Sequence, residues 1–158
     1  NECVAAASDG RFATFDGAHW STPGTLSTHP VTVTGLSCAT ATMCMAVSRF
    51  GATFRYDGTE WTSAGGLQGL SQISCTTDTF CVALAYADSY VYDGTSWGAP
   101  TTIRDDDNNY LFPQTLTCNA PYECMAIGIG TRIGYDNPPR SLAEDYSGHE
   151  TATSTEAN

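Results

Sequence analysis

The sequence predicts an all-β fold: a β-propeller of about four blades of four antiparallel strands, or an arc of a larger propeller. Three observations support this prediction. A unit of about 40 residues recurs along the chain, with its second cysteine at Cys44, Cys81 and Cys124. Each of these units contains a C-x5-C pair followed by a Tyr-Asp turn signal. No stretch of the 158 residues shows helical periodicity.

Each unit divides into four short strands. In the most regular unit, strand a runs over 33–38, strand b over 44–48 and strand c over 52–56, and strand d begins at Trp61. Asp57-Gly58 is a hairpin signal, because Asp and Gly tolerate the positive φ of a type I′ turn. The other units repeat this order, so the same four strand positions are expected in each blade.

The repeat predicts blades at 1–30, 31–66, 67–104 and 105–140. The segment 141–158 is expected to be a C-terminal tail or a strand that closes the ring. The last unit has Asp136-Asn137-Pro138-Pro139-Arg140 at the turn, and a proline pair disfavours a paired strand d. The first unit begins at strand b. We therefore expect residues 1–20 to form three strands, completed by a fourth from 141–158 or from another chain or copy.

The cysteines predict local disulfides. Six of the seven form pairs of equal spacing: Cys38 with Cys44, Cys75 with Cys81, and Cys118 with Cys124. Zinc sites usually use C-x2–4-C with further Cys or His nearby, which these pairs lack. Three disulfides indicate an oxidising compartment and hence a secreted, extracellular protein. Cys3 aligns with the second cysteine of the other units, so it is expected to be unpaired or linked to another chain.

The repeat also resembles a known type. The units read CVAAASDGRFATFDGAHW, CMAVSRFGATFRYDGTEW, CVALAYADSYVYDGTSW and CMAIGIGTRIGYDNPPR. This pattern resembles the disulfide-stapled propeller repeats of secreted bacterial proteins, of the form I-S-C-x5-C-x-A-V…Y-D-G-x-x-W, and is distantly similar to Asp-box and kelch repeats. The resemblance covers about residues 3–140. It implies a propeller architecture, which many different functions share.

The charge balance excludes several classes of partner. Seventeen Asp and Glu residues face six arginines and no lysine, for a net charge of −11. So acidic a surface repels phosphate backbones and anionic lipid, so neither a nucleic acid nor a membrane is expected as a partner. The lack of lysine excludes Schiff-base chemistry and a phosphate-loop lysine within this chain.

No catalytic residue is predicted. The run from Gly94 to Gly98 matches G-x-S-x-G, but that motif needs a strand–turn–helix context that this chain lacks. The tryptophans after the turns, Trp20, Trp61 and Trp97, are expected to wedge between neighbouring blades, where each would bury a large apolar area.

Binding is expected where the blades differ. In an up-and-down blade the b–c turns and the d–a connections lie at one end, and here they vary in length and composition. The candidate ligand-binding residues near that end are Arg49, Phe50, Asp88, Tyr90, Arg104 and Tyr110. Within the same connection Asp105, Asp107 and Asn109 could supply oxygen ligands to Ca²⁺. A solvated acidic loop is the alternative, and no other cofactor is indicated.

These observations favour a secreted, non-catalytic β-propeller that acts as a binding or assembly module for a protein or glycan. Two alternatives remain open. One is a glycan-active enzyme, or part of one, that uses carboxylates near the ring axis. The other is a calcium-stabilised lectin-like module.

Overall fold

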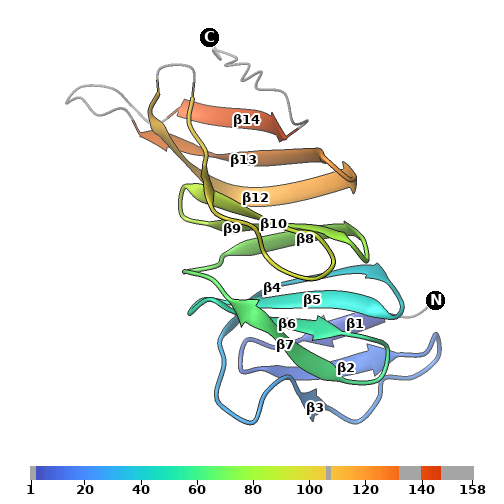
Figure 1. The fold of residues 1–158 in the computed structure, drawn as a ribbon. Coiled ribbons are helices and arrows are strands. Elements are labelled where there is room, and N and C mark those ends of the chain that lie inside the picture. The colour runs from blue at the N-terminus through green and yellow to red at the C-terminus, as the bar shows by residue number, and fades with distance from the viewer. Residues whose placement is uncertain (1–2, 106–107, 132–139, 147–158) are drawn as a thin grey trace.

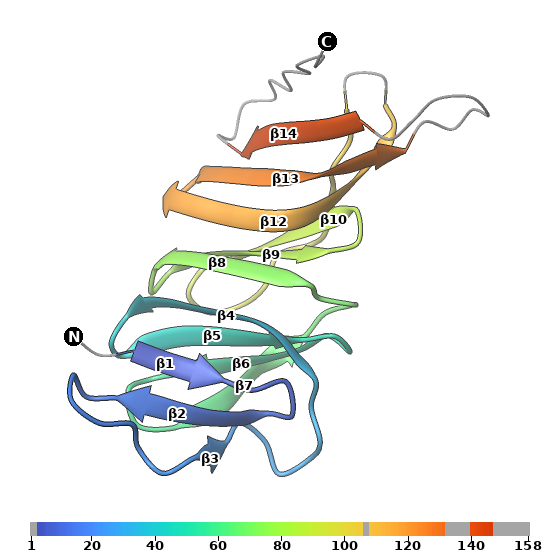
Figure 2. The ribbon, with the colours of Figure 1, turned by 180° about the vertical axis from the view of Figure 1, so that it is seen from behind.

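The computed structural model describes residues 3–105, 108–131 and 140–146, and it contains four antiparallel sheets stacked one on the next. Figures 1 and 2 show the first and last sheets at opposite ends of the stack. The sheets therefore form an open arc, and the all-β prediction is confirmed. No helix in the described part of the chain is long and apolar enough to cross a membrane.

The two middle sheets each contain all four predicted strands. The second sheet is formed by β4 (Val33–Thr40), β5 (Met43–Ser48), β6 (Ala52–Tyr56) and β7 (Trp61–Gly66). The third is formed by β8 (Gln72–Thr77), β9 (Phe80–Ala85), β10 (Asp88–Tyr92) and β11 (Thr101–Thr102). Strand d is short in the third sheet, where Trp97 makes only an isolated bridge to Tyr92. Pro100, which has no N–H to donate, precedes β11.

The first sheet contains strands b, c and d, as β1 (Cys3–Ala6), β2 (Arg11–Phe15) and β3 (Gly24–Thr25). Its third strand lies beyond residue 20, so the expectation of three strands within 1–20 is wrong. Trp20 makes only an isolated bridge to Phe15, and Pro23 interrupts the segment before β3. In the described part of the chain β1 is an edge strand.

The last sheet is formed by β12 (Tyr110–Ala120), β13 (Glu123–Thr131) and β14 (Arg140–Tyr146). β14 occupies the place of strand c, which the repeat put before Asp136, so the predicted position of strand c is wrong in this unit. β14 pairs with β13, from Cys124 opposite Tyr146 to Gly130 opposite Arg140. Residues 141–146, which were expected to form a tail or to close the ring on the first sheet, therefore belong to the last sheet. The remaining residues of that segment, 147–158, lie outside the described residues.

The predicted disulfides are confirmed. Cys38–Cys44, Cys75–Cys81 and Cys118–Cys124 are bonded, and each pair lies directly across strands a and b, with Cα atoms 3.9–4.0 Å apart. Cys3 is a free, exposed thiol.

The turn after strand c is held by its aspartate. Asp57 Oδ1 accepts hydrogen bonds from the backbone N–H of Thr59 (2.8 Å) and of Glu60 (3.0 Å). The Tyr56 hydroxyl donates to the carbonyl oxygen of Gly58 at 2.9 Å, and Gly58 has a φ of +98°. The same bonds recur at Tyr92 and Asp93. Asp57 does not have positive φ, so the hairpin prediction holds but the type I′ assignment is wrong.

The core lies between successive sheets. Along β5, Met45 and Val47 pack toward the third sheet, whereas Ala46 packs toward the first. The predicted wedge is confirmed at two tryptophans. The Trp61 ring lies 5.7 Å from Phe12 of the preceding sheet, and Trp97 Nε1 donates to Thr53 Oγ1 at 3.2 Å. Trp20 has no described sheet before it and is 53% exposed.

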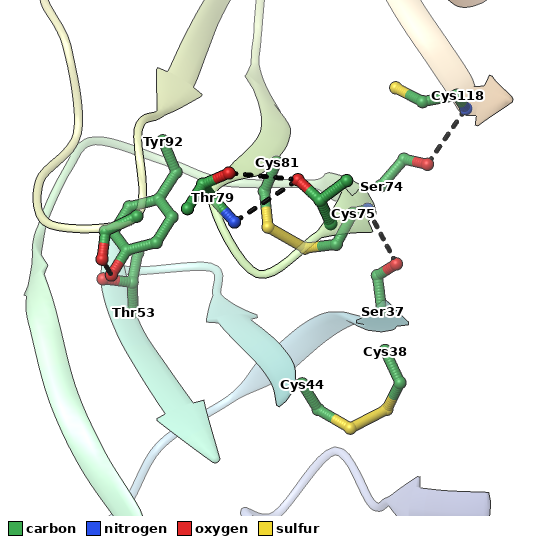
Figure 3. The surroundings of a disulfide bond; sticks show 12 residues. Ser37, Cys38, Cys44, Thr53, Ser74, Cys75, Thr79, Cys81, Tyr92 and Cys118 are labelled. Carbon is green, nitrogen blue, oxygen red and sulfur yellow. Dashed lines mark hydrogen bonds between the residues drawn. A yellow bond between two sulfur atoms is a disulfide. The ribbon is translucent and has the colours of Figure 1, made fainter. Parts of the chain in front are cut away.

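A hydrogen bond also repeats between sheets. Ser37 Oγ accepts from the backbone N–H of Cys75 at 2.9 Å, and Ser74 Oγ accepts from that of Cys118 at 3.0 Å. Figure 3 shows both bonds beside the disulfides. In the second and third units, the residue before the first cysteine therefore links its sheet to the next.

Candidate functional site

The b–c turns and d–a connections lie at one end of the sheets, because each sheet is an antiparallel meander. We call this end the loop end. It carries the turn 49–51 of the second sheet, the turn 86–87 of the third and the connection 103–109 between the third and last sheets. The disulfide loops and the Asp-Gly turns lie at the opposite end, where a methyl group of Thr42 lies too close to Gly58 for a Cβ at that glycine.

Two aromatic side chains at equivalent turns are exposed at the loop end. Phe50 is 81% exposed and Tyr86 is 72% exposed. The turn that carries Phe50 is held by hydrogen bonds from Arg49 N–H to the Thr32 carbonyl (2.9 Å) and from Gly51 N–H to the Ser48 carbonyl (2.9 Å). Both rings therefore project from turns on a rigid scaffold rather than from the core.

The Tyr86 turn places a large ring in an unusual backbone conformation. Tyr86 has a φ of +54°, which non-glycine residues rarely adopt. Its ring lies against Gly69, so closely that a Cβ on that glycine would overlap the ring carbons. Gly69 thus leaves room for the ring at the surface. Tyr86 was not among the residues predicted from the sequence, although it occupies the same b–c turn as Phe50 in the aligned units.

The connection that contains Arg104 and Tyr110 is a small closed loop. Ile103 N–H donates to the Ala87 carbonyl at 2.7 Å, and Leu111 N–H donates to the Ile103 carbonyl at 3.1 Å. The Arg104 guanidinium lies over the Tyr110 ring, 4.1 Å from its centroid, and Arg104 Nη1 donates to the Asn108 carbonyl at 2.9 Å. These contacts fix an exposed cation against an aromatic ring.

The charges at the loop end are unevenly paired. Arg11 pairs with Asp9 at 2.8 Å, and this is the only ion pair among the side chains of residues 3–105 and 108–130. Arg49 and Arg104 are both exposed and form no ion pair with a described carboxylate. In a chain of net charge −11, these two guanidinium groups are cations that a partner's carboxylate can reach.

Two of the predicted binding residues have structural roles. Tyr90 is only 7% exposed and packs in the core between the second and third sheets. The prediction that Tyr90 binds a ligand at the surface was wrong. Side chains alternate between the two faces of strand c, and Tyr90 shares the inward face with Tyr92. Asp88 Oδ1 accepts a hydrogen bond from Thr102 Oγ1 at 2.7 Å, which ties strand c to strand d.

The candidate calcium ligands are only partly described. The Asp105 carboxylate accepts hydrogen bonds from Asn109, whose backbone N–H lies at 2.7 Å and whose Nδ2 lies at 3.0 and 3.1 Å from the two carboxylate oxygens. Asp107 lies outside the described residues. Across residues 3–105 and 108–130, no three His, Cys, Asp or Glu side chains gather closely enough to hold a metal ion.

Comparison with known proteins gives matches at the level of fold. No family model and no curated protein matches the chain. Among solved structures, YCF48 from Cyanidioschyzon merolae superposes with a TM-score of 0.57 at 17% identity, over 80% of this chain and 44% of that one. YCF48 bound to D1 peptide superposes with a TM-score of 0.59 at 14% identity, over 93% of this chain and 47% of that one.

The fold is a β-propeller arc. The chain spans less than half the length of either YCF48 chain. At these identities the similarity extends to the architecture alone, so a role for this chain has to be argued from its own side chains.

Proposed function

We propose that this chain is a non-catalytic protein-binding module of an extracellular, oxidising compartment, and that it binds a polypeptide partner at the loop end. The observation that carries the proposal is the pair of exposed rings, Phe50 and Tyr86, at the same end of the sheets as the exposed cations Arg49 and Arg104. Aromatic and arginine side chains dominate the energetics of protein interfaces. None of the four contributes to the buried clusters of the fold.

The arrangement favours a particular kind of peptide. The two rings offer apolar area at low entropic cost, since a Tyr or Phe ring has only two side-chain torsions to fix. Arg104 is already held against Tyr110, so less freedom is lost when it binds a carboxylate. The preferred partner is therefore a segment that combines apolar or aromatic side chains with acidic ones.

Two further facts support this proposal. YCF48 bound to D1 peptide is a protein of similar fold in complex with a peptide, so such a scaffold can accommodate one. The three disulfides fit a module that works outside the reducing cytosol, which supports the extracellular location.

The test is selection from a displayed random-peptide library against the purified chain. The affinity of each enriched peptide is then measured for the wild-type chain and for the Phe50→Ala, Tyr86→Ala and Arg104→Gln variants. Loss of a central aromatic contact typically costs at least 2 kcal/mol, so affinity should fall roughly 30-fold or more for the aromatic variants. Tyr122→Ala is the matched control, because Tyr122 is 60% exposed but lies at the disulfide-loop end.

The outcomes separate the candidate functions. Acidic–apolar peptides that lose affinity with the loop-end variants but not with Tyr122→Ala support the proposal. Peptides that bind all variants equally, or no enrichment at all, would overturn it. A glycan array run in parallel tests the other partner class. Glycan binding that depends on Phe50 and Tyr86 would replace the polypeptide by a carbohydrate ligand.

A further inference from the structure

The face of the last sheet that points away from the third sheet is apolar and exposed. On β13, Met125 and Ile127 are 48% and 45% exposed, and Ile129 is also exposed. Phe112 of β12 lies directly across from Ile129, and cross-strand partners share a face. These four residues form what we call the outer face of the last sheet.

The same positions are buried in the sheets that have a following neighbour. Counted from the second cysteine, Met125 and Ile127 correspond to Met45 and Val47 in β5, and to Val82 and Leu84 in β9. These four residues are at most 1% exposed. Met45 and Val47 are covered by the third sheet, and Val82 packs with Cys124 of the last sheet. The outer face of the last sheet is thus a sheet-packing surface without a described partner.

The first sheet presents the complementary surface. Each unit carries small residues at alternate positions of strand b, facing the preceding sheet: Cys81, Ala83 and Ala85 are buried against the second sheet in this way. The equivalent residues of the first unit are Cys3, Ala5 and Ala7, and all three are exposed. Trp20, equivalent to the wedges Trp61 and Trp97, is also exposed. Together they form the outer face of the first sheet.

We propose that the outer face of the last sheet binds the outer face of the first sheet of a second copy, head to tail. Large side chains would pack on small ones with a tryptophan beside them, as they do between the second and third sheets. One copy carries both halves of this contact at the two ends of its arc (Figures 1 and 2).

The size of the fold supports a second copy as the occupant. This chain covers 44% and 47% of the two YCF48 chains, so two copies in sequence span about the length of one such chain. Two four-sheet arcs supply eight sheets, which is within the range of propeller rings. Such a contact is heterologous, because different surfaces of the two copies meet.

Two features make the contact weaker than those within the chain. Ser37 and Ser74 each accept a hydrogen bond from a backbone N–H in strand a of the next sheet. The first sheet has no described strand a, so Thr117, the equivalent residue of the last unit, would have no such donor in a second copy. Glu123 also stands where the second and third units have Met43 and Phe80, both buried. The association is therefore reversible and concentration-dependent, and Glu123→Met strengthens it.

Light scattering over a concentration series tests the proposal. The chain mass of 16.7 kDa should rise to at least twice that value with concentration. Ile127→Glu and Trp20→Glu, made separately, should each keep the monomer mass at every concentration. Mixed in equal amounts they should form a one-to-one dimer, because each variant retains the face that the other has lost. Ala99→Glu, which adds the same charge at an exposed residue in the segment before β11, should associate normally.

Other results would overturn the proposal. A wild-type chain that stays monomeric throughout excludes the contact. If Trp20→Glu still associates by itself while Ile127→Glu does not, the last sheet packs against its own copy, face to face. Failure of the mixed variants to associate would also exclude the head-to-tail arrangement. Unfolding temperatures of all variants confirm that the charged substitutions, each at an exposed residue, leave the fold intact. Reactivity of the Cys3 thiol provides a second readout, since the contact covers that face.

Discussion

Replacing Trp61 by alanine should destabilise the fold far more than replacing Trp20, although both residues occupy the same repeat position. Trp61 is partly buried, packs with Phe12 of the preceding sheet at 5.7 Å and lies 5.2 Å from Tyr56. Truncating a buried Trp costs about 3–5 kcal/mol, so Trp61→Ala should cost about 3 kcal/mol. At about 2–4 °C per kcal/mol for a chain of this size, the midpoint of thermal unfolding falls by about 6–12 °C.

Trp20 has only an intrablade contact to lose. Its ring lies 5.2 Å from Phe15, and an aromatic pair of this kind contributes about 0.5–1.5 kcal/mol. Trp20→Ala should therefore cost about 1 kcal/mol and lower the midpoint by about 2–4 °C.

Thermal unfolding followed by circular dichroism measures both, with the disulfides intact and at a concentration where the chain is monomeric. Trp61→Phe is the control, because it keeps an aromatic ring and removes Nε1, which is buried without a hydrogen-bond partner. Equal shifts for Trp61→Ala and Trp20→Ala would refute the assignment of the tryptophans as wedges between sheets.

Three further predictions concern the turns and the cysteines. Hydrogen bonds, above all from the backbone N–H three residues on, lower the pKa of Asp57 and Asp93 from 3.8 to about 2. The stabilisation by these carboxylates is therefore complete above about pH 4 and is lost as the pH falls toward 2. An Asp57→Asn, Asp93→Asn variant, which keeps the acceptor oxygen but not the charge, should show a smaller fall of unfolding temperature between pH 4 and pH 2. Gly58→Ala should cost more than about 1 kcal/mol, since Gly58 has positive φ and no room for a Cβ, whereas Gly66→Ala, with nothing within 4 Å of its Cβ position, should be neutral by the same melting assay. A thiol reagent should modify only Cys3 in the native chain, as mass spectrometry of non-reduced peptides would check, and a second reactive cysteine would contradict the disulfide pattern.

The features that repeat could be predicted from the sequence because local geometry determines them. A C-x5-C pair across two strands joined by a tight turn places the cysteines opposite each other, as Cys38 and Cys44 are. The Tyr-Asp-Gly run encodes its own turn through bonds within five residues. Copies of the unit reinforce both patterns, so the strand order of the second and third sheets followed from alignment alone.

Features that depend on a neighbouring sheet could not be predicted from one unit. Tyr90 was expected at the surface because it follows a variable turn, but the alternation of strand c directs it into the core. Tyr86 was missed because its exposed position depends on space left by Gly69, which lies in the connection between β7 and β8. Hydrogen bonds inside the 103–109 connection, such as those between Asp105 and Asn109, likewise depend on a loop conformation that composition does not specify.

The two proposed interactions, self-association and partner binding, use different surfaces of the sheets. In strand b the second cysteine of a unit faces the preceding sheet, and the residue after it faces the following sheet, as Cys81 and Val82 do. Every sheet therefore has two chemically different faces, and a stack that repeats the contacts within the chain grows head to tail. A partner bound at the loop end contacts neither face, since Phe50 and Tyr86 lie on turns beyond the strands. Self-association and partner binding should consequently be separable: Ile127→Glu removes the first and leaves the second, and Phe50→Ala does the reverse.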